Sequence, residues 1–107
     1  MPKGEFLGEF ELMVMLAVLR LEETAYGMEV RREIEARTGR DAAIGAVYAT
    51  LDRLELKGLV RSREVAPGFD TGRPRRLYRV TAAGARTLAR TRDAAAAMWD
   101  GVKVPGV

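Results

Sequence analysis

The segment Ile44–Val65, IGAVYATLDRLELKGLVRSREV, contains the change of hydrophobic pattern that decides the fold. In its first half, Val47, Leu51 and Leu54 recur at spacings of four and three residues, which predicts that they share the core-facing side of one helix. A glycine is placed to end this helix. We therefore expect a helix over Ala46–Lys57.

A basic β-hairpin is predicted to follow. Apolar and polar residues alternate along Val60–Val65 and, less cleanly, along Leu77–Thr81, with the Gly- and Pro-rich stretch APGFDTGRPRR between them. From Arg61 to Arg79, six arginines stand against two acids, a local charge of +4 in a chain whose net charge is +3. A single basic stretch on an otherwise balanced chain is typical of a nucleic-acid binder.

The flanking segments are predicted to be helical. Phe10–Leu21 is apolar nearly all round, which predicts a helix buried on every side. Tyr26–Arg37 carries an apolar residue at every fourth position among charged ones, which predicts a narrow amphipathic helix. Thr81 can cap a final alanine-rich helix, whose first turn Gly84 is expected to weaken.

Composition excludes several classes of function. The 107 residues fit one domain, and the chain has neither cysteine nor histidine, so we expect no disulfide, no metal site, no cofactor and no histidine-dependent catalysis. The longest apolar run, Leu12–Leu19, is eight residues, against the roughly 18 that span a bilayer. The N-terminus lacks the pattern of a signal peptide, so we expect a cytoplasmic protein with no membrane partner.

Three helices, a basic hairpin and a fourth helix predict a mainly α fold with a small β-hairpin, the winged helix-turn-helix. In that fold the third helix enters the DNA major groove and the hairpin reaches along the backbone. We expect residues 1–81 to form this DNA-binding part and residues 82–107 to form a dimerisation helix and tail, in one compact domain overall.

The sequence resembles the PadR family of bacterial transcriptional regulators. The family's Gly-x-x-Tyr-x-x-Leu-x-x-Leu-x-x-x-Gly helix is matched over Gly45–Gly58, its Gly-Arg-Pro-Arg over Gly72–Arg75, and its Tyr-x-x-Thr-x-x-Gly over Tyr78–Gly84. The resemblance covers roughly Phe10–Leu88. It implies a homodimeric, usually repressive, DNA-binding protein of the small subtype.

Two departures bear on DNA recognition. Ala43 and Ala46 stand where members of the family often have a small polar residue and a threonine, which removes possible caps or phosphate contacts. The chain also contains no Asn and no Gln, the residues that pair bidentately with adenine. Direct base recognition then falls to Arg on guanine and to apolar contacts with thymine methyls, and the shape of the DNA gains weight.

Candidate DNA contacts come from the third helix and the hairpin. On the helix, the side opposite the core either contacts DNA or is simply exposed to solvent, and the tyrosine on its flank either donates to a phosphate or packs on the hairpin. The helix candidates are Ala46, Tyr48, Ala49, Thr50 and Arg53. The hairpin candidates are Arg61, Gly72, Arg73, Pro74, Arg75 and Arg76.

The Gly72–Pro74 turn has two interpretations. It either presents Arg73 on a narrow, extended backbone to an A-T minor groove, or it rigidly closes the hairpin with the arginine in solvent. Because the arginines alternate along the strands, some must point away from DNA.

The last helix is predicted to form a dimer. Its seam follows alternating steps of three and four residues, the heptad pattern of helix pairing, interrupted only by an arginine. The seam residues are Ala85, Leu88, Arg92, Ala95 and Trp99, joined by Met98, with Phe6 and Phe10 contributing from the N-terminal side. A two-fold dimer would place two recognition helices on the half-sites of a palindromic operator, about one DNA turn apart.

The tryptophan at position 99 has two possible roles: a dimer anchor, or a surface on which a small aromatic effector stacks at the dimer centre, as the family resemblance implies. The expected function is a homodimeric repressor released by a small molecule or another effector. The competing class is a winged-helix protein-interaction module that does not bind DNA. An enzyme is the weakest class, because the adjacent acids Glu22 and Glu23 lack a partner acid or a phosphate-binding motif.

Overall fold

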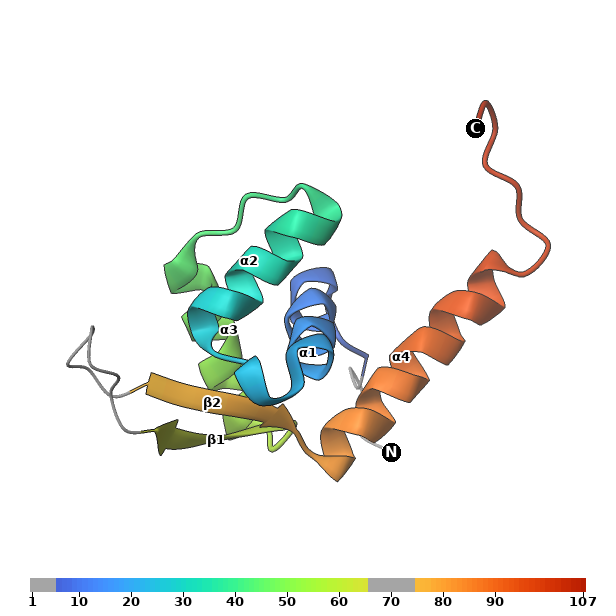
Figure 1. The fold of residues 1–107 in the computed structure, drawn as a ribbon. Coiled ribbons are helices and arrows are strands. Elements are labelled where there is room, and N and C mark those ends of the chain that lie inside the picture. Colours follow the sequence, from blue (N-terminus) through green and yellow to red (C-terminus); the bar gives the residue numbers. More distant parts are fainter. Residues whose placement is uncertain (1–5, 66–74) are drawn as a thin grey trace.

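The computed structural model describes residues 6–65 and 75–107. Three helices pack together, a two-stranded hairpin lies along one end of them, and the fourth helix projects away from the group (Figure 1). In chain order the elements are α1 (Glu9–Leu21), the 3₁₀ turn η1 (Glu22–Thr24), α2 (Gly27–Thr38), α3 (Ile44–Leu56), β1 (Val60–Val65), β2 (Arg75–Val80) and α4 (Ala82–Trp99). This is the predicted order of elements. Among the described residues, no helix combines the length and the apolar composition that crossing a membrane requires.

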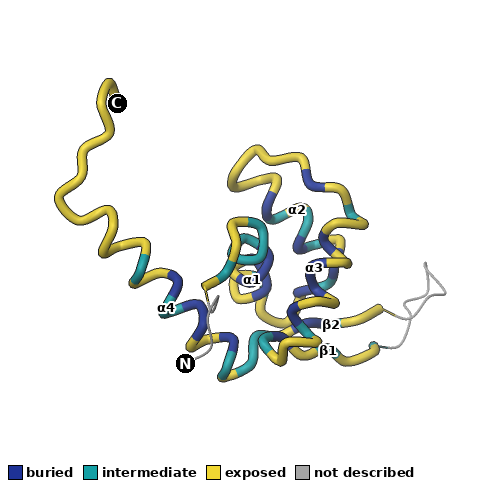
Figure 2. The backbone as a smooth tube through the Cα atoms, turned by 180° about the vertical axis from the view of Figure 1, so that it is seen from behind, coloured by how far each residue is buried: buried dark blue, intermediate teal, exposed yellow. Residues whose placement is uncertain are grey.

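The core lies where α1, α2 and α3 face one another. Val47, Leu51 and Leu54 are completely buried, which confirms the predicted core side of α3. Figure 2 shows the buried positions on the facing sides of the three helices. The prediction that α1 is buried on every side is wrong, because Leu16 and Leu19 are 42% and 49% exposed.

The hairpin has two unlike faces, which its pairing register defines. Val60 pairs with Val80 and Val65 with Arg75, so β2 begins two residues before the predicted start. Paired residues point to the same side of a sheet and neighbours along a strand to opposite sides. The inner face, which packs toward the helices, carries Val60, Ser62, Glu64, Arg76, Tyr78 and Val80. The outer face carries Arg61, Arg63, Val65, Arg75, Leu77 and Arg79.

The link before α2 contacts the other edge of β2 through an isolated bridge. The Tyr78 backbone N–H donates to the Ala25 carbonyl at 3.0 Å, and Tyr26 forms an isolated antiparallel bridge with Leu77. β2 is therefore paired with β1 on one edge and held at its middle by the link before α2 on the other.

The start of α4 is joined to the turn that follows α3. Thr81 Oγ1 accepts the Gly84 backbone N–H at 3.0 Å, which confirms the predicted N-cap, and donates to the Gly58 carbonyl at 2.7 Å. Gly84 is buried, and a Cβ at this position would collide with the Leu59 carbonyl oxygen. The glycine therefore permits a close backbone contact, beyond the helix-weakening effect that the sequence suggests.

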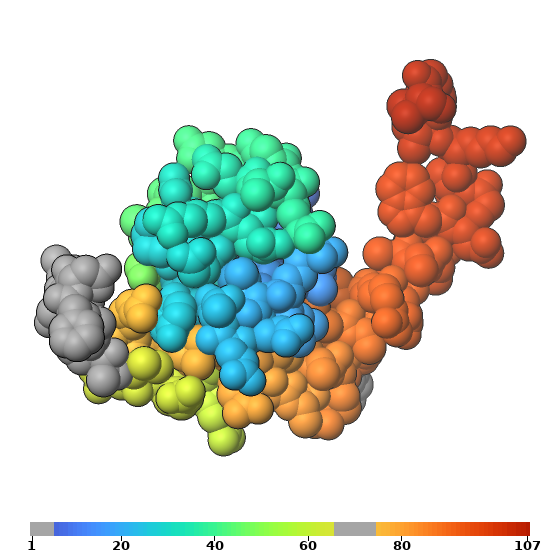
Figure 3. Space-filling view, viewed as in Figure 1, coloured from blue at the N-terminus to red at the C-terminus, as the bar shows by residue number. Residues whose placement is uncertain are grey.

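Within the described residues, the buried positions of α4 all lie between Gly84 and Thr91. Its core side carries the buried residues Gly84, Thr87, Leu88 and Thr91, and the Leu7 backbone N–H donates to Thr91 Oγ1 at 3.0 Å. The second half stands clear of the molecular surface (Figure 3). The radius of gyration of 15.5 Å accordingly exceeds the roughly 13 Å of a compact domain of this length.

Candidate nucleic-acid interface

The exposed side of α3 is not composed of the residues that were predicted for it. Thr50 is only 2% exposed, so the prediction that it shares the exposed side is wrong. It lies three residues after Val47 and four before Leu54, a spacing that brings it to the core side. Its hydroxyl accepts a hydrogen bond from Arg53 Nη2 at 3.2 Å, so Thr50 helps to orient an exposed arginine from below.

The exposed side also includes residues that the sequence analysis missed. The missed residues are Gly45, Asp52 and Leu56, which together with the predicted Ala49 follow spacings of four, three and four residues, and all four are exposed. They form the line opposite the core, with Ala46 and Arg53 exposed along one flank. The helical spacing that identified the core would also have found this line, had it been extended around the opposite side. The side chains on this surface are small and apolar near the start of α3. Farther along the helix the surface carries one carboxylate and one guanidinium.

Tyr48 lies on the other flank of α3 and packs against α2. Its side chain is exposed enough to reach solvent, and a Cβ on Gly27 would lie 2.6 Å from its hydroxyl oxygen and closer still to its ring. Gly27 is the first residue of α2, so the phenol lies beside the N-terminus of that helix. The packing alternative for Tyr48 named the hairpin as its partner, whereas the close packing seen here is against α2.

The loop between α2 and α3 is tied to the helices by arginines. Arg31 Nε donates to the Ala42 carbonyl at 2.9 Å, and Arg40 pairs with Glu9 at 2.9 Å while lying over the Phe10 ring, 4.9 Å from its centroid. A groove of about 540 Å³ runs between this loop and the exposed side of α3. It is lined by Phe10, Arg40, Asp41, Ala42, Ala43, Ala46, Ala49, Thr50 and Arg53.

The arginines of the hairpin divide between its faces, as predicted, but unequally. Arg61, Arg63, Arg75 and Arg79 are exposed on the outer face, where Arg75 lies over the Tyr26 ring, 4.3 Å from its centroid. Arg76 is on the inner face. The predicted groove-binding residues Gly72, Arg73 and Pro74 lie outside the described residues.

Carboxylates gather where α3 meets the hairpin. Burial raises the pKa of the Tyr78 phenol, and the negative charges of Asp52 and Glu55 raise it further. Glu55 accepts hydrogen bonds from the Ser62 backbone N–H at 3.1 Å and from Ser62 Oγ at 2.9 Å. The flank of α3 toward the hairpin is thus acidic, whereas Arg53 lies on the flank toward the loop, which itself carries Arg40 and Asp41.

The predicted dimer residues are placed in two groups. Leu88 is only 7% exposed and packs in the core of its own chain, so its assignment to an exposed seam is wrong. The reason is that the core side of α4 includes Leu88 together with Gly84 and Thr91. The rest form the second group: Phe10 is half-buried, and Phe6, Ala85, Arg92, Ala95, Met98 and Trp99 are exposed.

Three helices with a hairpin packed beside the third define a winged helix-turn-helix protein. The model of the PadR-like family of transcriptional regulators matches residues 15–90, so this chain belongs to that family. Family membership makes it a transcriptional regulator, a class defined by regulation rather than catalysis.

Solved structures share the fold. A PadR family transcriptional regulator from Eggerthella lenta DSM 2243 is 30% identical, with a TM-score of 0.69, over 87% of this chain and 81% of that one. A PadR family regulator from Clostridium difficile R20291 is 23% identical, with a TM-score of 0.70, over 87% and 93% of the two chains. The chain in the complex structure of hsRosR-S4 is also 23% identical, with a TM-score of 0.70, over 91% and 77%. No curated protein matches this sequence.

Proposed function

We propose that this regulator binds double-stranded DNA as a homodimer, represses transcription from a palindromic operator, and is released by an effector. The proposal rests on one observation: α3 has an exposed side, and the hairpin beside this helix presents four arginines on its outer face. In this arrangement α3 enters the major groove while the hairpin contacts the adjacent backbone.

Base recognition would rely on few side chains. Arg53 is the exposed guanidinium of α3 and suits guanine, whereas the methyl groups of Ala46 and Ala49 suit thymine methyls. Tyr48, Arg61, Arg75 and Arg76 would contact phosphates, and Gly72, Arg73 and Pro74 would reach the minor groove. Thr50 acts through Arg53, because it is buried.

The dimer would form through the free half of α4. Met98 and Trp99 are 78% and 61% exposed, and apolar residues on α1 are also exposed. Together they form an apolar surface that a second chain would cover. Two-fold pairing there would hold two copies of α3 at a fixed spacing. A flat apolar effector would stack on Trp99 at the dimer centre and change that spacing.

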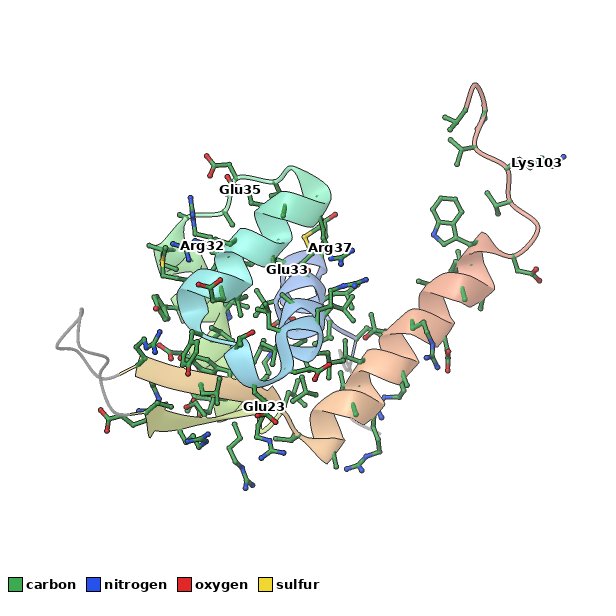
Figure 4. The ribbon with its side chains drawn as sticks, in the orientation of Figure 1. Glu23, Arg32, Glu33, Glu35, Arg37 and Lys103 are labelled. Carbon is green, nitrogen blue, oxygen red and sulfur yellow. The ribbon has the colours of Figure 1, made fainter. Side chains whose placement is uncertain are left out.

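The decisive experiment measures binding to duplex DNA at several salt concentrations, with the duplex selected from a randomised pool. Neutralising phosphates with arginines makes the logarithm of the binding constant fall linearly with the logarithm of salt. We expect such a fall, and a loss of about 1–3 kcal/mol for Arg53→Ala on the selected sequence. The matched control is Arg37→Ala, since Arg37 pairs with Glu33 on α2, away from the hairpin (Figure 4).

Two outcomes would contradict the proposal. A pool from which no duplex is enriched, with no salt-dependent binding, would favour the winged-helix protein-interaction module. Equal losses for Arg53→Ala and Arg37→Ala would remove the assignment of α3 as the recognition helix.

A further inference from the structure

We propose that Glu55, Ser62 and Arg76 form a strut that fixes the hairpin relative to the recognition helix and aims Arg76 at the DNA backbone. The inference rests on the proposed DNA-binding function, and it assigns Arg76 a different job from the outer-face arginines. These three residues come from α3, β1 and β2, so one chain of hydrogen bonds joins all three elements.

Hydrogen bonds connect Ser62 to Glu55 on one side and to Arg76 on the other. Ser62 Oγ lies 2.9 Å from both carboxylate oxygens of Glu55, and its backbone N–H donates to the same carboxylate at 3.1 Å. On the other side, Arg76 Nε donates to Ser62 Oγ at 2.9 Å. The serine is therefore bound by its backbone and its side chain to α3 and by its side chain to β2.

The chemistry of the three groups leaves only one direction for these bonds. An ionised carboxylate can only accept, a guanidinium can only donate, and a hydroxyl has one proton and two lone pairs. Ser62 must therefore donate to Glu55 and accept from Arg76. A side chain without a hydroxyl would leave Glu55 and Arg76 without the atom that connects them. Ser62 is the only serine in the chain.

The strut lies where apolar packing of the inner face ends. Val60 and Tyr78 are 2% exposed and fasten the base of the hairpin, whereas the next inner positions toward its outer end are Ser62, Glu64 and Arg76. Beyond Tyr78, the described part of the inner face has no apolar side chain. Polar bonds, rather than burial, therefore set the angle between α3 and the outer part of the hairpin on this side.

The consequence for Arg76 is pre-organisation. The Nε hydrogen is used by Ser62, which holds the guanidinium plane, so a phosphate would be bound through the terminal N–H groups. A side chain already held in its binding orientation loses less conformational entropy when it binds. Glu55 meanwhile has its charge turned toward Ser62, so it does not face the DNA.

The test compares Ser62→Ala with Ser62→Thr, which keeps the hydroxyl and suits a strand. We expect Ser62→Ala to weaken binding of the selected duplex by about five- to twenty-fold and to lower the salt slope by about one phosphate. Ser62→Thr should restore most of both. In an Arg76→Ala background, Ser62→Ala should add less than about two-fold, because coupled residues are not additive.

A second measurement needs no DNA. In the free protein, the Arg76 Nε–H proton should exchange slowly with solvent, and Ser62→Ala should accelerate this exchange while the circular dichroism spectrum stays unchanged. Wild-type binding and salt slope in Ser62→Ala would overturn the strut while leaving the DNA-binding proposal intact. Fast Nε–H exchange in the wild type would overturn it as well. Slow Nε–H exchange without any DNA binding would instead overturn the proposed function, and with it the aiming of Arg76.

Discussion

Gly84 packs against the backbone of Leu59 so closely that a Cβ at position 84 would collide with the Leu59 carbonyl oxygen. This contact joins the first turn of α4 to the turn between α3 and β1. We expect Gly84→Ala to lower the free energy of unfolding by about 1–3 kcal/mol, since a backbone carbonyl cannot move aside as a flexible side chain can.

The measurement is urea unfolding followed by circular dichroism. Gly45→Ala is the control, because Gly45 lies in the first turn of α3 with no atom within 4 Å of a built Cβ. Alanine there should be neutral or slightly stabilising. Equal effects of the two substitutions would show that the contact at Gly84 does not limit stability.

Acid should weaken the anchoring of the N-terminus of α1 through Glu11. Burial raises the pKa of the Glu11 carboxyl, but the Gly8 backbone N–H and the Lys57 ammonium, with a smaller effect of Arg53, lower it further, so the net pKa is below its ordinary value. A lowered pKa in the folded state means that the ionised form stabilises the fold. This contribution is complete above the unfolded-state pKa of about 4.3 and is lost as the pH falls through the folded-state value.

Glu11→Gln should therefore lower stability at pH 7 and flatten the loss of stability on the acidic side. Urea midpoints between pH 7 and pH 3 measure both effects, with exposed Glu35→Gln on α2 as the comparison. If the urea midpoint falls equally steeply with decreasing pH in Glu11→Gln and in the wild type, the ionised Glu11 carboxylate does not stabilise the fold as proposed.

Trp99 should hold the dimer together. It is 61% exposed at the end of α4, so Trp99→Ala removes no contact from the core of its own chain but removes a large apolar surface. We expect a shift toward monomer in sedimentation at micromolar concentration and a collapse of operator affinity, although no DNA contact is changed.

Val102→Ala, in the tail after α4, tests whether any exposed apolar residue would serve, because Val102 is 56% exposed. It should sediment like the wild type. A monomeric wild type, or a Trp99→Ala protein that remains dimeric and binds the operator normally, would refute dimerisation through α4.

Arg73 and Arg75 should differ in sequence dependence. From the Gly-Arg-Pro sequence, Arg73→Ala is expected to weaken binding by about 1–3 kcal/mol and to relax preference for A-T flanks. Arg75→Ala should weaken binding to all sequences alike, because an outer-face arginine would contact phosphate rather than bases. Binding to duplexes with A-T and G-C flanks separates the two, and equal losses on both flanks for both variants would remove the minor-groove role.

Local patterns predicted the fold because each element is defined by a period within one segment. The core positions Val47, Leu51 and Leu54 and the cap at Thr81 follow from spacing and residue type alone. Thr50 and Leu88 were misplaced for one reason: both lie at the edge of a helix side, where a period of 3.6 residues allows either side. Their burial depends on which neighbouring element covers that edge.

Contacts between distant segments left no local signal. The Glu55–Ser62–Arg76 chain needs the strand register, and the close approach of Gly27 to the Tyr48 ring needs the packing of α2 on α3. A glycine and a serine look like ordinary small residues until the partner segment is known. The missed line of Gly45, Asp52 and Leu56 was recoverable, because it uses the same helical period as the core.

Because α4 is attached to the rest of the molecule at Thr81 and Gly84, a small tilt at this attachment moves its far end by a large distance. Its 18 residues are about 27 Å long at 1.5 Å per residue, and its near end is fastened to the turn that ends α3. A tilt of about 10° at the attachment therefore displaces the far end by about 5 Å. In the proposed dimer, a shift of a few ångströms between two paired far ends would rotate the attached end of each α4, and with it the direction of each α3. The distance between the DNA half-sites that such a dimer spans would then be set by the angle at which the two copies of α4 cross.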